Sequence, residues 1–445
     1  MSHYKPYPDY KDSGVEWIGK VPKDWGVKPI KIIASCNDDS LPESIPSDTP
    51  IHYVDISAVS HDEGISGAEP MVFGEAPSRA RRKAKSGDVI VSTVRTYLKA
   101  VAAVDDNHAD CIYSTGFAVI RARKEEVNPR FLKWLVLNDL FIQSVESHSE
   151  GLSYPAINAP ELMNLKAAIP SLSEQVVIAS ILDRATSRID ALIAKKTRFI
   201  ELLKEKRSAL ITDAVTGKFD VATGKPYLKY KDSGIPWLGE VPEHWEIAPL
   251  KRSFQIVGGA TPKSEQEAYW DGEIVWVTPS DLSKLSSINI SDSQRKITSE
   301  GLASCGTALV PSGSIVLSTR APIGSLAIAE TELCTNQGCK SLVPIADTQS
   351  RFFGYLLSTS TGELNIRGKG TTFLELSGDE LGAFKVGVPP NAEQLAIAAF
   401  LDRATSRIDA LIAKTQRSID LLKERRSALI TAAVTGQIDL RGEIA

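Results

Sequence analysis

A block of about 220 residues occurs twice in this 445-residue chain, and this duplication constrains the fold more than any other feature. The segment YKDSGVEWIGKVPKDW at 10–25 returns as YKDSGIPWLGEVPEHW at 230–245, with ten of sixteen positions identical. The segment LDRATSRIDALIAK begins at Leu182 and occurs again, unchanged over fourteen residues, at Leu401. A repeat of half the chain indicates a tandem duplication of one scaffold rather than a solenoid of many short repeats.

The two copies diverge strongly between these matched ends, across residues 26–168 and 246–387. Both divergent regions keep a glycine that precedes an apolar strand and an arginine, in Gly87 to Arg95 and in Gly313 to Arg320. Differences in length and sequence between two copies of one scaffold belong in loops. We therefore expect two constant scaffolds that carry two different globular domains.

These patterns predict four segments along the chain. They are a first variable domain at 1–170 with its YKDSG segment, a central helix at 171–217, a linker and second variable domain at 218–389, and a C-terminal helix and tail at 390–445.

The repeated C-terminal segments have the apolar periodicity of long helices. Start signals are Ser171 with Glu174 and Asn391 with Gln394, and Gly217 and Gly436 are stop signals. We call the row of apolar residues that should face a partner helix the seam. In the first helix the predicted seam contains Leu182, Ile189, Leu203 and Leu210 and is interrupted by Lys196. Its companions, three residues after seam positions, are Ala185, Leu192 and Phe199. In the second it contains Leu401, Ile408, Leu422 and Leu429, interrupted by Thr415, with Ala404, Leu411 and Ser418 as companions.

A helix from about 173 to 215 would be roughly 60 Å long and needs a partner along its length. The nearest candidate for each helix is the other, which predicts an antiparallel coiled coil with a pseudo-two-fold axis and one variable domain at each end.

The variable domains have the mixed strand and helix patterns of an α/β (α+β) fold. In the first we expect strands at 51–59, 88–94, 100–104 and 111–123 and a helix at about 129–146. In the second we expect strands at 274–278, 314–319 and 323–329 and a helix at about 348–363.

The composition, with 42% apolar and 24% charged residues, is that of a soluble globular protein. The N-terminus has no apolar signal region and no apolar run is long enough to cross a membrane, so we expect a cytoplasmic protein. Five cysteines without a CxxC pair argue against a disulfide framework and a zinc site. The net charge of −4 argues weakly against nucleic-acid binding, although a local basic run occupies 79–85.

The usual catalytic motifs are missing. The sequence contains no GxxxxGK[ST] loop, no GxGxxG turn between strand and helix, no HExxH pair and no GxSxG serine. We therefore expect no enzymatic activity, no metal site and no cofactor in this chain.

Taken in order, these motifs resemble those of the specificity subunit of type I restriction-modification systems, over nearly the whole chain. The resemblance rests on both YKDSG segments, the Glu174-Gln175 and Glu393-Gln394 pairs, the repeated helices, and second-domain strings at 259–262, 276–279, 297–302, 318–320, 335–338 and 370–373. The first domain departs from this pattern, because Ser114-Thr115-Gly116 stands where the second has Asn336-Gln337-Gly338. The two domains should therefore read different half-sites.

The resemblance implies a reader of double-stranded DNA that leaves catalysis to partner subunits. Each target-recognition domain would read one half of a bipartite site, and the coiled coil would set the gap. Two methyltransferase subunits would dock on the repeated helices, flip an adenine in each half-site and methylate its N6 atom from S-adenosylmethionine. Restriction subunits, which use ATP and Mg²⁺, would cut unmodified DNA. Much of the phosphate clamp would belong to these partners, so the isolated chain should bind DNA weakly.

Candidate base-reading residues are polar side chains in loops of the variable domains, because Arg favours guanine while Asn and Gln favour adenine. In the first domain they are Arg79, Arg81, Arg82, Lys83, Arg95, Tyr97, Lys99 and Tyr154. In the second they are Lys263, Arg320, Asn336, Gln337, Arg367, Lys369, Thr371 and Thr372. Most could equally contact phosphate or solvent, and Asn336-Gln337 could simply order a turn. The tryptophans of the YKDSG segments, Trp17, Trp25, Trp237 and Trp245, are assigned to packing.

Two alternatives remain open at this point. One is a catalytic DNA enzyme with an unrecognised site, which would act without partner subunits. The other is a scaffold for two protein partners, which predicts apolar patches rather than polar loops on the variable domains.

Overall fold

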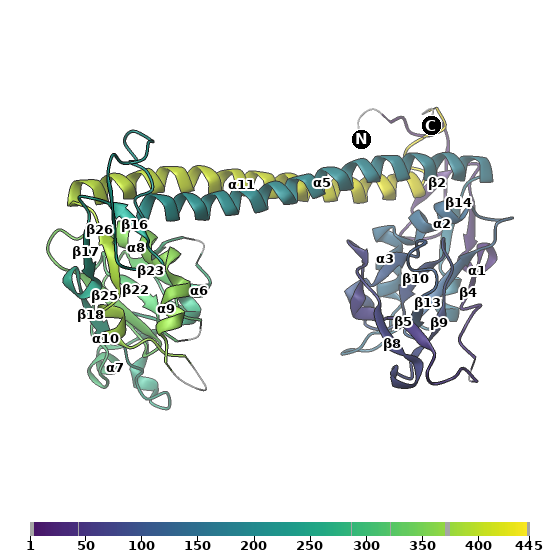
Figure 1. Ribbon diagram of the computed structural model, residues 1–445. Coiled ribbons are helices and arrows are strands. Elements are labelled where there is room, and N and C mark those ends of the chain that lie inside the picture. The colour runs from purple at the N-terminus through teal and green to yellow at the C-terminus, as the bar shows by residue number, and fades with distance from the viewer. Residues whose placement is uncertain (1–3, 43, 286, 321, 370–373, 443–445) are drawn as a thin grey trace. The chain divides into compact units, whose positions relative to one another are not determined.

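The chain forms two compact units, each of which contains half of both long helices. The computed structural model describes residues 4–42, 44–285, 287–320, 322–369 and 374–442 (Figure 1). Unit 1 comprises Met1–Thr197 and Gln416–Ala445, and unit 2 comprises Arg198–Thr415. The unit boundaries fall inside helices α5 (Leu172–Val215) and α11 (Asn391–Val434), each of 44 residues. Among the described residues, no helix combines the length and apolar character needed to span a membrane.

Unit 1 carries two four-stranded sheets, ordered β11-β10-β13-β4 and β8-β5-β12-β9. In the second sheet β12 runs parallel to β5 and antiparallel to β9. The bounds of these strands are β4 Ala34–Cys36, β5 Pro50–Val54, β8 Glu69–Val72, β9 Ala80–Lys83, β10 Val89–Ser92, β11 Val101–Ala103, β12 Ile112–Ser114 and β13 Phe117–Ala122. Three two-stranded antiparallel sheets complete the unit. They pair β1 (Tyr10–Asp12) with β2 (Lys20–Pro22), β3 (Gly26–Pro29) with β14 (Lys166–Ile169), and β6 (Val59–Ser60) with β7 (Gly64–Ile65).

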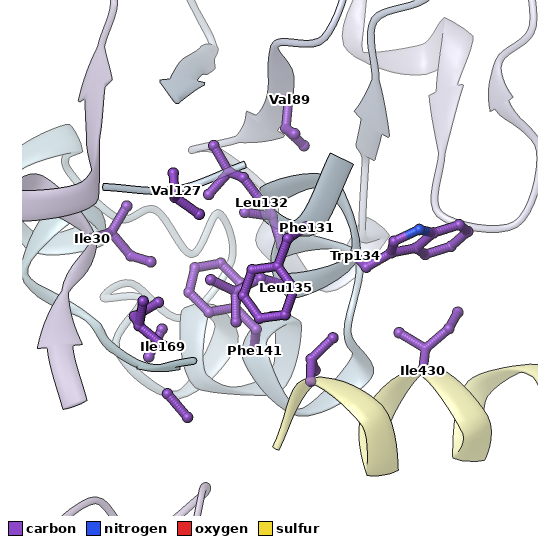
Figure 2. Packing of buried hydrophobic residues seen from close by; sticks show 14 of the residues in the cluster. Ile30, Val89, Val127, Phe131, Leu132, Trp134, Leu135, Phe141, Ile169 and Ile430 are labelled. Carbon is purple, nitrogen blue, oxygen red and sulfur yellow. The ribbon is translucent and has the colours of Figure 1, made fainter. Parts of the chain in front are cut away.

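The main core of unit 1 joins its globular part to both long helices. Phe131 and Trp134 of helix α2 (Pro129–Val136) are buried in one cluster with Leu182 of α5 and Ile430 of α11. Figure 2 shows Ile430 of α11 on the same side of this core as Trp134. The other helical segments are α1 Ile30–Ile33, η1 Ile56–Ala58, η2 Phe73–Glu75, η3 Thr96–Leu98, α3 Asp139–Ser147 and α4 Ala159–Asn164.

Unit 2 has the same plan with different loops. Its larger sheets are ordered β18-β25-β22-β23-β20 and β21-β19-β24, and two further two-stranded sheets pair β15 with β16 and β17 with β26. The strand bounds are β15 Tyr230–Asp232, β16 Glu240–Pro242, β17 Glu246–Pro249, β18 Phe254–Gly258, β19 Trp270–Val277, β20 Asn289–Ile290, β21 Lys296–Ile297, β22 Ile315–Ser318, β23 Leu326–Ala329, β24 Cys334–Thr335, β25 Cys339–Pro344 and β26 Lys385–Val388. The helical segments are η4 Leu250–Arg252, η5 Glu267–Tyr269, α6 Pro279–Ser283, α7 Ser299–Ala303, α8 Ser350–Thr359, α9 Thr361–Arg367 and α10 Gly378–Gly382.

Four of the predicted elements are split in the structure. The strand expected at 51–59 is divided into β5 and the start of β6, with η1 between them. The strand expected at 111–123 is β12 and β13, separated by the Thr115-Gly116 turn. The helix expected at 129–146 is α2 and α3, because the Asn138 side chain accepts a hydrogen bond from Leu140 N–H and starts a new helix. The helix expected at 348–363 is likewise divided into α8 and α9. Periodicity alone did not locate these breaks because buried residues continue on both sides of each of them.

The seam of the long helices follows alternating steps of three and four residues. Leu182, Ile189 and Leu203 of α5 and Leu401, Ile408 and Leu429 of α11 are buried, whereas Leu210 and Leu422 are partly buried. The companion row expected three residues after the seam positions does not form the packed row, because Leu192, Phe199 and Leu411 are about half exposed. The companions that pack lie four residues after each seam position, at Thr186, Ile193 and Ile200 in α5 and at Thr405, Ile412 and Ile419 in α11.

The long helices pack antiparallel within each unit. In unit 1 Asp190 of α5 forms an ion pair with Arg426 of α11 at 3.0 Å. In unit 2 Arg207 of α5 forms an ion pair with Asp409 of α11, also at 3.0 Å. Asp190 and Asp409 occupy the same position of the repeat, as do Arg426 and Arg207. The same contact is therefore made in both units with the helices exchanged, as in isologous packing.

The predicted glycine stops close the long helices in left-handed conformations, with φ of +71° at Gly217 and +73° at Gly436. Lys218 N–H donates to Asp213 O at 2.8 Å and Gln437 N–H donates to Ala432 O at 2.8 Å, which is the Schellman pattern. A Cβ at Gly217 would collide with the Pro242 ring, and a Cβ at Gly436 with the Pro22 ring. Each helix end is thus fitted against one YKDSG segment.

The tryptophans of the YKDSG segments pack inside the units, as predicted. Trp25 and Trp245 are fully buried, Trp17 makes an edge contact with Phe141, and Trp237 stacks on Phe384 with ring centroids 5.5 Å apart.

Truncating Leu182 tests the observed seam. Leu182→Ala should lower the free energy of unfolding by about 2–5 kcal/mol, because it leaves a cavity beneath α5. Leu192→Ala, the matched control, removes a half-exposed side chain and should change it by less than about 0.5 kcal/mol. Urea unfolding followed by circular dichroism measures both. Equal losses would contradict the seam described here and favour the companion row expected from sequence.

Candidate DNA interface

A buried glutamine joins each long helix to the globular part of its unit. In unit 1 the Gln175 side chain donates to Pro170 O at 3.0 Å and accepts from Asn128 N–H at 2.7 Å. In unit 2 Gln394 donates to Pro389 O at 2.9 Å and accepts from Gln349 N–H at 3.3 Å. Because a buried amide needs partners for both of its polar atoms, each joint holds one relative orientation of helix and domain.

An acidic residue about two helical turns further along reinforces each joint. Asp183 accepts from Trp134 Nε1 at 2.8 Å and pairs with Arg130, and Asp402 accepts from Tyr355 Oη at 2.6 Å and pairs with Arg351. The scaffold therefore presents its domain with the same chemistry in both units.

A tyrosine from the segment before each YKDSG repeat forms a hydrogen bond with a glutamate in the first turn of one long helix. Tyr7 donates to Glu174 at 2.6 Å, and Tyr227 donates to Glu393. Burial and these hydrogen bonds raise the pKa of both tyrosines. Both hydroxyls therefore remain protonated donors at neutral pH.

The basic run of unit 1 lies along strand β9, and its members have different surroundings. Arg79 is held by Asp55, at 2.7 Å, and by Tyr53. Partial burial alone would raise the pKa of Asp55, but hydrogen bonds from Ser57 N–H, Tyr53 and Arg79 hold it below its usual range. Arg81 lies over the Phe73 ring, 4.6 Å from its centroid, the Arg82 Nε is buried, and Lys83 is exposed.

The remaining candidates of unit 1 gather where two segments meet. Arg95, Tyr97 and Lys99 belong to the turn around η3, and Arg95 lies over the ring of Tyr154 at 4.9 Å from its centroid. Arg95 N–H donates to Pro155 O at 2.7 Å, which ties the turn to the loop that carries Tyr154. Tyr154 lies 55 or more positions after the other three residues in the sequence, and the fold brings the two segments together.

The candidates of unit 2 are mostly engaged by neighbouring acidic or aromatic groups. Arg320 pairs with Glu375 at 3.1 Å, and Lys369 pairs with Glu380 at 2.7 Å, which lowers the pKa of Glu380. Arg367 lies over the Phe384 ring with its Nε buried, and Lys263 is exposed. Thr371 and Thr372 lie outside the described residues.

Asn336 and Gln337 play different parts in the turn between β24 and β25. The Asn336 side chain accepts from Gly338 N–H at 3.0 Å and so orders the turn, which is the alternative role that the sequence left open. The exposed Gln337 instead accepts from the Thr261 hydroxyl. The corresponding turn of unit 1 lies between β12 and β13. In both units the turn is bonded to the threonine that follows a neighbouring strand. Thr93 N–H donates to Gly116 O after β10, and Thr319 N–H donates to Gly338 O after β22, each at 2.8 Å. Gln337 is therefore the member of the pair whose side chain is exposed to solvent.

Sequence reasoning missed the apolar part of the unit 1 surface. Val94, Leu98 and Leu152 are exposed beside Arg95 and Tyr154. The sequence search considered only polar side chains. The available signal was the apolar dipeptide Tyr97-Leu98, which lies between Arg95 and Lys99.

Each unit also contains a groove between its globular part and the long helices, of about 1050 Å³ in unit 1 and about 820 Å³ in unit 2. The matched helical lining residues, in unit 1 and unit 2 respectively, are Asp190 and Asp409, Ile193 and Ile412, Lys423 and Lys204, and Arg426 and Arg207. The globular side of each groove differs, with His61 and Asp62 in unit 1 and Leu285 and Ser287 in unit 2. A partner that uses the helical side would meet the same chemistry twice.

Within the described ranges, no group of three or more His, Cys, Asp or Glu side chains is arranged to hold a metal ion.

Comparison with known proteins identifies relatives over the whole chain. A family model described as the type I restriction modification DNA specificity domain matches residues 79–202 and 242–421, more than half of the chain. A putative type I restriction enzyme MjaX specificity subunit from Methanocaldococcus jannaschii is 26% identical over 443 residues, covering 95% of this chain and 96% of the relative. The MjaIX specificity subunit of the same organism is 34% identical over 198 residues, or 44% of each chain.

Two solved structures share the fold. One, from work on complex assembly and conformational transition of the type I R-M system, has a TM-score of 0.71 at 24% identity and covers 95% of this chain and 99% of that one. The other, the HsdS subunit from Thermoanaerobacter tengcongensis, has a TM-score of 0.55 at 24% identity and covers 96% and 100%. These similarities agree with the expected mixed fold with two long packed helices.

Removing the Asn336 side chain tests its role in the turn. Asn336→Ala should lower the free energy of unfolding by about 0.5–1.5 kcal/mol, because it leaves Gly338 N–H without its acceptor. Gln337→Ala, its exposed neighbour, should change it by less than about 0.5 kcal/mol. Urea unfolding measures both variants, and an unchanged Asn336→Ala protein would mean that the turn is ordered by its backbone alone.

Proposed function

This chain belongs to the family of type I restriction modification DNA specificity domains, and on that premise we propose that it selects the DNA target for a separate methyltransferase. Each unit would read one half of a bipartite double-stranded site. The chain itself would contribute sequence recognition and assembly, while catalysis would belong to its partners.

The observation that carries this proposal is the contrast between constant joints and divergent loops. Gln175 and Gln394 hold their domains through the same hydrogen bonds, whereas the turns that begin at Ser114 and Asn336 differ in both side chains that precede the glycine. A constant frame with variable polar loops suits a protein that places two different reading surfaces on one DNA molecule.

The helices support two further parts of the proposal. Because the helical side of the groove is repeated in both units, one methyltransferase subunit would dock on each, giving two copies. Because α5 and α11 run through both units, their length would set the number of unread base pairs between the half-sites. Restriction subunits would join the same assembly.

Cofactors would belong to the partners. S-adenosylmethionine would bind the methyltransferase subunits, which would transfer its methyl group to adenine N6, and ATP and Mg²⁺ would serve the restriction subunits. The partners would also supply much of the positive surface that phosphates require, which is consistent with a net charge of −4 on this chain.

Methylation mapping tests the proposed function. The chain is co-expressed with the type I methyltransferase subunit of its own genome, and methylated adenines are mapped across the host genome. A bipartite motif with a fixed gap, absent when this chain is omitted, is expected. Methylation by the purified chain alone with S-adenosylmethionine would favour a catalytic enzyme, and methylation that does not depend on the chain would favour a protein scaffold.

A substitution in one unit should alter one half of the motif. Gln337→Ala removes a side chain that can pair with adenine and should reduce discrimination at one position of one half-site by about 1–3 kcal/mol, or 5- to 150-fold. The other half-site should be unchanged. Glu265→Ala, an exposed residue elsewhere in unit 2, is the control. Methylation mapping of both variants measures the effect, and loss of specificity in both halves would contradict independent reading by the two units.

A further inference from the structure

Five large apolar side chains of unit 1 are exposed on two segments that pair with each other. They are Val94, Tyr97, Leu98, Leu152 and Tyr154, and we call them the apolar patch. Leu152 is as exposed as in a free peptide, at 105%, and Tyr154 is 66% exposed. The two segments are joined because Val94 pairs with Ala156 and Ile157 N–H donates to Thr93 O at 2.9 Å. Exposed apolar clusters of this kind mark interaction sites.

The backbone holds the first segment in a strained shape. Arg95 and Lys99 both have left-handed conformations, with φ of 50°, which non-glycine residues seldom adopt. Between them the buried Thr96 donates to Ser149 Oγ at 2.9 Å. Tyr97 is exposed to solvent, and the half-exposed Leu98 lies at the edge of the groove that faces the long helices. Strain of this kind persists where surrounding contacts fix it, commonly at functional sites.

The second segment is closed at its base. Glu150 N–H donates to Ala156 O and Ala156 N–H donates to Glu150 O, both at 2.9 Å. Gly151, with φ of +110°, begins the turn that presents Leu152. The apolar patch is therefore built on two anchored segments.

Two features favour DNA rather than a protein as the occupant of the patch. First, cations lie within it, since Arg95 covers the Tyr154 ring and Lys99, which is 3.9 Å from Glu146, ends the turn. Second, the second segment differs in sequence between the two copies, because Leu152 and Ser153 stand where unit 2 has Thr371 and Thr372. In unit 2 the corresponding turn buries Ile323 and pairs Arg320 with Glu375. A partner subunit that docks twice needs the same surface twice, whereas a contact with one half-site should differ between the units.

We propose that the apolar patch is a wedge that presses against one base step of the half-site read by unit 1 and unstacks it, with Leu152 and Tyr97 as the inserted side chains. Apolar side chains that enter a duplex between base pairs act in this way, and the flanking cations would contact the phosphates of the opened step. Selectivity would follow because base steps differ in the cost of unstacking. This inference rests on the function proposed above.

The test uses the full chain assembled with its methyltransferase subunit on a duplex that carries the mapped motif. 2-Aminopurine replaces one base at a time in the half-site of unit 1, and its fluorescence reports unstacking. We expect a rise at one step other than the methylated adenine. Leu152→Ser and Tyr97→Ser should each abolish that rise and weaken binding by about 5- to 150-fold, the range for loss of one stacking contact.

The matched control is Leu228→Ser, because Leu228 is equally exposed, at 102%, but belongs to the linker of unit 2. It should change neither fluorescence nor affinity. The rise at the methylated adenine should persist in every variant that binds DNA. All three residues are exposed, so the variants should keep the melting temperature of the parent chain.

Three outcomes would overturn the wedge. They are a fluorescence rise that does not depend on Leu152 or Tyr97, the same step opened in both half-sites, and variants that bind DNA normally but fail to assemble with the methyltransferase, which would make the patch a protein-docking surface. Absence of any bipartite motif in the mapping experiment would instead refute the proposed function, so the two failures are distinguishable.

Discussion

The buried row along α5 and α11 is the contact on which both units depend. Neither long helix can bury its apolar face alone, because the face runs the full length of the helix while each globular domain covers only one end. Leu182 and Leu429 are buried in the core of unit 1, and Leu401 and Ile211 in that of unit 2. Each core is thus completed by the end of one long helix and the beginning of the other.

This arrangement explains why the polar joints are so closely repeated. A globular domain that packs on a helix through apolar side chains alone could rotate or slide, since hydrophobic contact is not directional. The buried amides of Gln175 and Gln394 remove that freedom, because each amide must meet two backbone partners at once. The carboxylates of Asp183 and Asp402 add a second fixed point.

The loops obey a different constraint. Ser114 and Asn336 each accept a hydrogen bond from the glycine two residues later and so order their turns, whereas the next residues, Thr115 and Gln337, are exposed. Exposed side chains contribute little to stability, so these two positions can change without disturbing the joints behind them. The same turn is held to its sheet by equivalent backbone hydrogen bonds at Thr93 and Thr319. A reading surface can therefore diverge while its position is kept, which is what a bipartite DNA reader requires of its two domains.

The sequence by itself determined the duplication, the extent of the long helices, their glycine stops and the family, because each of these is a local pattern or a direct repetition. It did not determine the companion row of the seam, since Leu192 and Thr186 lie on adjacent helix faces and only the partner helix decides which one is buried. It also did not separate α2 from α3, or distinguish Gln337 from the turn-ordering Asn336. The joining of Arg95 to Tyr154, and the exposure of Leu152 beside them, was decided by the tertiary structure alone, because hydrogen bonds between distant backbone segments create that surface.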